Sequence, residues 1–252
     1  MPRYLLRNCV MAIACTGTFV GCGGAILDMP VPEVDACSAP LGLRLSDTQS
    51  LVNWINAMPH PLTLPCFVRS LPRPLYAYST ASGESAQPSI GDNNPRVFLF
   101  FDKLTLSIVP GERFSTLPSG EPSPADPDKH NLLEVSYNTQ GVKSIKGEIK
   151  FPIVNPLPDS GPYENLAFRD TASICSLCHR GEVKYGEING VPIYESDRLK
   201  PLDPIGFKPM RTDYEACATL PESYHCNMLQ AIFDPGEIRW QEFPAGLPNI
   251  YY

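Results

Sequence analysis

Two cysteines and a histidine stand close together in the chain, as Cys175-Ser176-Leu177-Cys178-His179. Two thiols separated by two residues can add across the two vinyl groups of a haem, and the next residue can place an imidazole on the iron. The sequence therefore predicts one covalently attached c-type haem. Cys175 and Cys178 would be its thioether anchors, and His179 would be the proximal iron ligand.

The same residues allow two other interpretations. The first is a dithiol or disulfide, which would be expected in a strand-helix-strand setting, and none is evident around the motif. The second is a zinc ion held by Cys175, Cys178 and a distant pair such as Cys217 and Cys226, whose spacing is wider than in common zinc knuckles. The histidine directly after Cys178 favours haem.

An export signal precedes the rest of the chain at residues 1–21. Arg3 and Arg7 are followed by an apolar stretch of about a dozen residues, too short to span a bilayer. The stretch ends at Gly21-Cys22, which resembles the bacterial lipobox, in which the cysteine is acylated. This resemblance implies a lipid anchor at Cys22, and Gly23 in place of Asp suggests the outer membrane. An ordinary cleaved signal or an uncleaved anchor is the alternative.

Nine cysteines occur in the chain. Two leave with the leader, acylation would use Cys22, and six remain in an oxidising compartment where pairing is expected. Proximity in sequence predicts two disulfides, Cys37 with Cys66 and Cys217 with Cys226.

The motif, the export signal and the length of 163–252 resemble those of small monohaem c-type cytochromes. The resemblance implies a single-electron carrier with a methionine or histidine opposite His179. Met210 follows a proline and is preferred, because an irregular segment can approach the iron without a helix crossing. Met228 and His225 are alternatives, and weaker candidates in other segments are His60 and His130. If none binds, the iron is five-coordinate and the site binds or senses a ligand.

The fold class expected is α+β. Helical spacing predicts a helix over 47–58, with Ser46 as N-cap and Gln49 in the capping-box position. Five runs rich in β-branched and aromatic residues predict a small antiparallel sandwich- or barrel-like domain; they are 74–80, 96–101, 104–109, 132–137 and 144–151. A proline-rich link then leads to a partly helical haem-binding region, with a helix from about 219 to 233.

The expected organisation is a signal peptide (1–21), a tether (22–36), a β-rich domain (37–158) and a haem-binding region (159–252). The 252 residues carry a formal net charge of -7 and 28 prolines, so a nucleic-acid partner is not expected. No hydrolase or phosphate-binding motif occurs, and there is no second haem motif. We expect an electron carrier rather than a catalyst, with an unidentified redox protein as partner. The alternative is a binding or structural lipoprotein that holds a structural or ligand-sensing haem, or zinc.

Overall fold

The computed structural model describes residues 37–81, 87, 95–111, 115–116, 122–123, 131–169, 171–219 and 223–249. The predicted signal peptide 1–21, the acylation site Cys22, the tether 22–36 and His130 lie outside the described residues. The chain divides into two units, Met1–Val34 and Asp35–Tyr252, and the second contains all the described residues.

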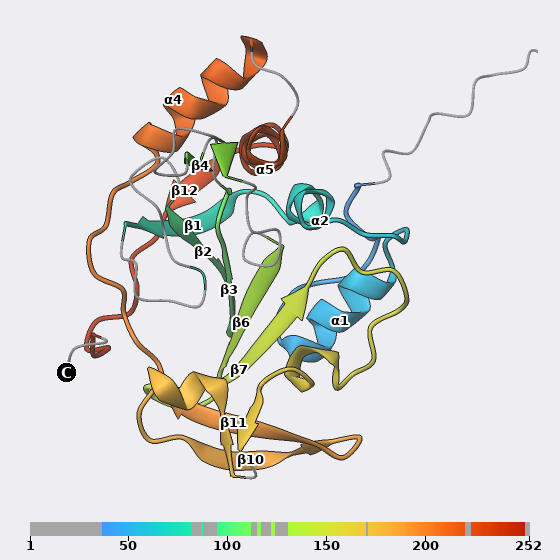
Figure 1. Ribbon diagram of the computed structural model, residues 1–252, viewed down its shortest axis with the longest axis vertical. Helices are drawn as coiled ribbons and strands as arrows, with labels where there is room; N and C mark the ends of the chain where they lie inside the picture. Colours follow the sequence, from blue (N-terminus) through green and yellow to red (C-terminus); the bar gives the residue numbers. More distant parts are fainter. Residues whose placement is uncertain are drawn as a thin grey trace, which may run out of the picture. The chain divides into compact units, whose positions relative to one another are not determined.

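One eight-stranded sheet forms the frame of this unit, so the fold is mixed α+β as predicted (Figure 1). The five predicted strands are present as β1 (Leu75–Thr80), β2 (Arg96–Phe101), β3 (Leu104–Ile108), β6 (Leu132–Asn138) and β7 (Lys143–Lys150). The later strands are β10 (Val183–Ile188), β11 (Val191–Asp197) and β12 (Ile238–Trp240). Two short pairs, β4 (Ser115–Thr116) with β5 (Pro122–Ser123) and β8 (Ala167–Arg169) with β9 (Ala172–Ser173), complete the strands.

The order across the main sheet is β10-β11-β7-β6-β3-β2-β1-β12. Neighbours are antiparallel except β1 and β12, which run parallel. Because β10 and β12 are its two edges, this is one open sheet and not the sandwich or barrel that the sequence suggested.

Strands β10 and β11 form a hairpin that the strand patterns in the sequence did not predict. They are joined by Asn189 and Gly190, whose φ angles are 52° and 81°. Two consecutive positive φ angles are required by the tight hairpin turn for which Asn-Gly is the favoured pair. The hairpin extends the sheet because β11 pairs antiparallel with β7.

Four α-helices occur in the described part of the chain: α1 (Thr48–Asn56), α2 (Leu64–Ser70), α4 (Lys208–Ala216) and α5 (Tyr224–Phe233). The first confirms the predicted helix but starts later, because Asp47 is its N-cap and Ser50 closes the capping box. The prediction that Ser46 is the N-cap and Gln49 its capping-box partner is therefore wrong. Three 3-10 turns are η1 (Gly161–Tyr163), η2 (Ile174–Leu177) and η3 (Cys217–Thr219). In these ranges no helix has the length and apolar character needed to cross a bilayer.

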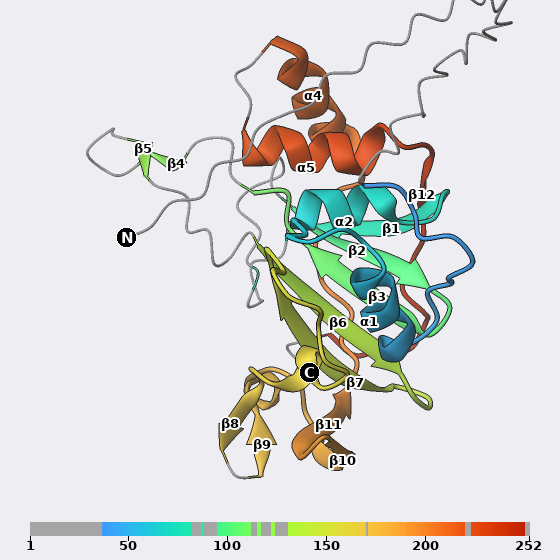
Figure 2. The same cartoon turned by 90° about the vertical axis from the view of Figure 1, so that its right-hand side faces the viewer.

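The hydrophobic core lies between one face of the sheet and helices α1, α2 and α5 (Figures 1 and 2). Alternate residues of the central strands point into it, so the face is apolar. Fully buried examples are Leu99 on β2, Leu106 on β3 and Leu133 on β6. The opposite face of the same strands is largely polar, and it is this face that carries the candidate site.

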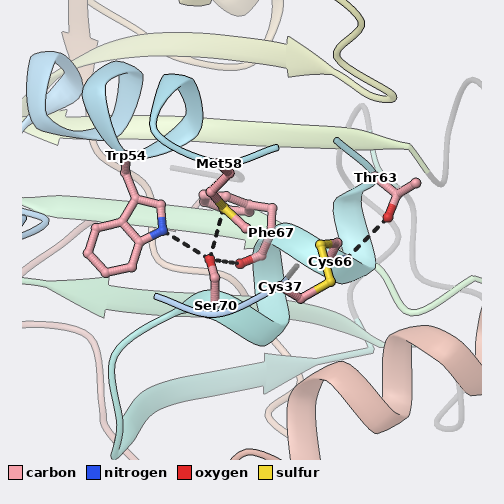
Figure 3. Close-up of a disulfide and its surroundings, with 7 residues drawn as sticks. All are labelled: Cys37, Trp54, Met58, Thr63, Cys66, Phe67 and Ser70. Atoms are coloured by element: carbon pink, nitrogen blue, oxygen red, sulfur yellow. Dashed lines mark hydrogen bonds between the residues drawn. A yellow bond between two sulfur atoms is a disulfide. The ribbon is translucent and has the colours of Figure 1, made fainter. Parts of the chain in front are cut away.

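Both predicted disulfides are confirmed. Cys37–Cys66 ties the start of the described chain to α2, and Figure 3 shows Phe67 and Ser70 of that helix between the disulfide and Trp54. The Trp54 indole donates to Ser70 Oγ at 2.9 Å, so its one polar atom is satisfied in the core. Cys217–Cys226 joins η3 to α5.

The division expected at 158/159 is not a boundary between two folded bodies. Strands β10, β11 and β12 come from beyond residue 158, yet they belong to the same sheet as β1 to β7. Helix α5 packs in the same core as α1 and α2. Residues on both sides of 158 thus form one compact unit.

Candidate functional site

The cysteine-histidine motif folds as a tight turn, η2, held by hydrogen bonds at both ends. Ser173 caps it by accepting from the Cys175 amide at 3.1 Å and donating to Glu182 at 2.6 Å. The amides of Cys178 and His179 both donate to the Cys175 carbonyl, at 3.2 and 2.8 Å. These bonds place both thiols and the imidazole on one short, rigid segment.

His179 is oriented by strand β11. Its Nδ1 lies 2.7 Å from the backbone carbonyl of Asp197. A carbonyl only accepts, so Nδ1 carries the proton and the lone pair is on Nε2, the arrangement typical of a metal-binding histidine. Asp197 is itself fixed, because its amide donates to the Arg180 carbonyl at 2.9 Å and its carboxylate pairs with Lys143 at 2.6 Å.

Burial shifts the pKa values of two side chains of the motif, His179 and Cys175. Burial, with a smaller contribution from the positive charge of Lys146, lowers the pKa of His179 to about 3. The imidazole is therefore neutral around pH 7. Burial raises the pKa of the Cys175 thiol, which is the opposite of what a nucleophilic dithiol motif requires. Both Cys175 and Cys178 are free thiols.

A cavity opens between the motif and the polar face of the sheet. Its floor is formed by alternate residues of four central strands, and the motif and the segment after β11 line it from other sides. Phe98 and Phe243, which stack edge to face at 5.0 Å, form an apolar wall. The polar floor consists of Arg96, Thr105, Ser107, Glu134, Ser136, Lys146 and Glu148, and the other lining residues that carry chemistry are Cys175, Cys178, His179, Arg198 and Lys200.

Arg96 and Lys146, two cations on the cavity floor, have different kinds of partner. Arg96 is neutralised by an ion pair with Glu134 and also donates to Ser107 Oγ at 2.7 Å. Lys146, which is 8% exposed, instead donates to hydroxyls, Ser144 Oγ at 2.5 Å and Ser136 Oγ at 3.5 Å. Burial lowers the pKa of Lys146 to about 7, even though Cys175 and Asp197 act against the shift. The lysine is therefore a buried amine whose hydrogen bonds go to neutral hydroxyls.

The sixth-ligand candidates are not brought to His179. Met210 on α4 and Met228 on α5 are fully buried in the core. His225 is buried as well, with Nδ1 at 2.6 Å from the Gly111 carbonyl and Nε2 at 3.5 Å from Asp213. His60 lies next to Ile153 on another part of the chain. None of these side chains lines the cavity.

The two ends of the sheet explain this separation. In both views α4 and α5 lie near β12, while the β10–β11 hairpin lies at the opposite end (Figures 1 and 2). The motif is attached to the hairpin end through His179 and Asp197. Proximity in sequence to the motif is therefore no guide to proximity in space for α4 and α5.

The alternative in which Cys217 and Cys226 bind zinc is wrong, because the two form a disulfide and a disulfide sulfur is no thiolate ligand. In the described ranges no group of three or more His, Cys, Asp or Glu side chains is arranged to hold a metal ion.

Compared with family models, with curated proteins and with solved structures, the chain matches none. The chemistry of the site therefore rests on its own residues. Lys146 and Asp197 are among the site residues that the sequence analysis did not predict. Lys146 stands in the predicted strand at a position that alternates with apolar residues, which is a detectable signal for a buried charge facing away from the core. Asp197 acts through its backbone carbonyl, so only a prediction of strand β11 could have indicated its role.

Proposed function

We propose that this protein is an exported, lipid-anchored c-type haem protein that carries single electrons. The observation that supports the proposal best is the hydrogen bond from His179 Nδ1 to the Asp197 carbonyl, on a turn that also presents two free thiols to a cavity. A haem held there would supply a reversible one-electron iron couple.

The residues of the cavity suit the different parts of a haem. Cys175 and Cys178 would form the thioethers, and His179 would offer Nε2 to the iron. Phe98 and Phe243 offer an apolar surface to the macrocycle. Arg198 and Lys200 line the same cavity, and as cations they suit the two propionate carboxylates of haem.

Attachment is tested by the intact mass of the protein made in a host with cytochrome maturation. We expect one added porphyrin mass that survives acid-acetone extraction. Cys175→Ser with Cys178→Ser should abolish it, while the control Ser176→Ala, between the two anchors, should retain it. A wild-type protein without the added mass would overturn the proposal.

Electron carriage is tested by a redox titration of the purified haem protein. A carrier should give a reversible one-electron curve and keep both axial ligands in the two oxidation states. Irreversible titration, or loss of the haem on reduction, would count against this role.

A second candidate, a haem that binds or senses a small ligand, is favoured by the polar floor of the cavity and by the remote positions of Met210, Met228 and His225. A polar distal side with hydrogen-bond donors is typical of haems that bind ligands. Carbon monoxide added to the reduced protein distinguishes the two. Rapid, stoichiometric binding supports ligand sensing, and a spectrum unchanged by carbon monoxide supports a six-coordinate carrier.

Export and lipidation are separate parts of the proposal. The two disulfides support an oxidising compartment such as the periplasm. If Cys22 is acylated, multiple acyl chains would hold the protein to the membrane, with the outer membrane as the expected location. Cys22→Ser should release it into the soluble fraction, and continued membrane retention would contradict acylation.

A further inference from the structure

The proposed haem would have His179 on one side of the iron, while the methionines and the histidine suggested for the other side lie elsewhere. We propose that Lys146 is the second axial ligand, with its Nζ reaching the iron from the sheet while His179 reaches it from the η2 turn. This inference rests on the proposed haem attachment.

The position of Lys146 supports this role. It lies on β7, opposite Ser136 of β6, on the polar face of the sheet and within the cavity. Cys175, Cys178 and His179 line the same cavity, so the amine and the motif share one space. Lys146 and His179 thus line one cavity from two separate elements, as two ligands on opposite sides of a haem must.

The other donor atoms of the cavity are less suitable. Glu134 is held by Arg96, and removing it would leave a buried guanidinium without its partner. Burial raises the pKa of Glu148, which favours its protonated form and weakens it as a ligand. Lys200 is only half-buried and lies after β11, where an isolated bridge to Asn249 and not a strand of the sheet holds its backbone. Lys146 is the cavity amine held in a strand.

Coordination requires a free lone pair, so the Lys146 ammonium must release one proton to solvent as the bond to iron forms. Burial already lowers the pKa of this group to about 7, which brings the release into the neutral range. The remaining N–H groups can still donate to Ser144 and Ser136, which lie at 2.5 and 3.5 Å. The hydroxyls would then orient the amine without competing for its lone pair.

The experiment uses the full-length holoprotein and its ferric electron paramagnetic resonance and near-infrared spectra. We expect low-spin iron in the wild type. Lys146→Leu, and Lys146→Arg, which keeps hydrogen-bond donors for the neighbouring hydroxyls but cannot coordinate, should both lose the low-spin signal and become high-spin. The matched control Lys150→Leu, an exposed lysine of the same strand that does not line the cavity, should keep it. Added methylamine should restore low-spin iron in Lys146→Leu.

Two results would overturn the inference. One is high-spin ferric iron in the wild type, and the other is a wild-type low-spin spectrum retained in Lys146→Arg. The arginine variant decides the outcome even if the leucine variant does not fold, because its guanidinium can still donate to the Ser144 and Ser136 hydroxyls. A missing porphyrin mass in the wild type would instead refute haem attachment, so the two proposals fail separately.

Discussion

The two faces of the central sheet are built from alternate residues of the same strands, yet they have opposite properties. Leu106 and its neighbours on the helix-covered face are fully buried and apolar. Thr105 and Ser107, one residue away on either side, lie on the cavity floor with Arg96 and Lys146. Because side chains alternate along a strand, adjacent residues pack in the core on one face and line the cavity on the other.

The difference shows where stability and chemistry are located. The covered face gains from the burial of apolar surface against α1, α2 and α5. The cavity face keeps charged groups partly or wholly buried, at a cost in desolvation that shifts the pKa values of Lys146 and His179. Perturbed pKa values of this kind gather at functional sites.

The largest expected effect on stability is on the covered face. Leu106→Ala should cost about 2–5 kcal/mol of unfolding free energy, because it removes buried methyl groups and leaves a cavity. Thr105→Ala, the adjacent residue on the other face, should cost about 1 kcal/mol or less. Chemical denaturation measures both. Equal losses of unfolding free energy in the two variants would contradict the conclusion that the covered face contributes most of the stability.

A pH effect should come from the cavity face. The pKa of Lys146 is about 7 in the folded chain and 10.5 in the unfolded chain, and Cys175 raises the folded value, so the haem-free variant Cys175→Ser with Cys178→Ser keeps the direction of this difference. As the pH falls through this window the unfolded chain takes up a proton and the folded chain does not. Stability should therefore decrease by up to about 1.4 kcal/mol per pH unit, and level off below pH 7.

Urea unfolding across this window measures the slope. Lys146→Leu in the same haem-free background should flatten it, since the group that titrates is gone. An unchanged slope in that variant would mean that other groups account for the pH dependence.

The smallest effect should be local to the motif. Ser173→Ala removes the cap of η2 and the donor to Glu182, at a cost of about 1 kcal/mol. Hydrogen exchange should show faster exchange of the Cys175 amide. Thr63→Ala, which removes the cap of α2 on the covered face, is the control and should leave that amide unaffected. Equal exchange in both variants would count against a separately held turn.

Local patterns predicted much of the fold. The five strands from 74 to 151, the first helix and both disulfides follow from periodicity, propensity and sequence proximity. The Asn189-Gly190 pair is an equally local signal for the β10–β11 hairpin, because both of its φ angles are positive.

Non-local pairing could not be predicted. Leu75 pairs in parallel with Ile238, and no feature of either segment indicates the other. The same pairing joins the two predicted domains into one. It also explains why the predicted sixth ligands do not lie near His179. Met210 and Met228 come after the motif in sequence but belong to the far end of the sheet.

The acceptor that orients the His179 ring is a main-chain oxygen, so it is present whatever side chain occupies position 197. Point substitutions there can weaken the ion pair with Lys143 but cannot delete the acceptor. Only a slip of β11 along β7 would move it, and such a slip would turn the whole strand over. The orientation of the imidazole therefore depends on the register of β11 against β7, and most single substitutions leave it unchanged.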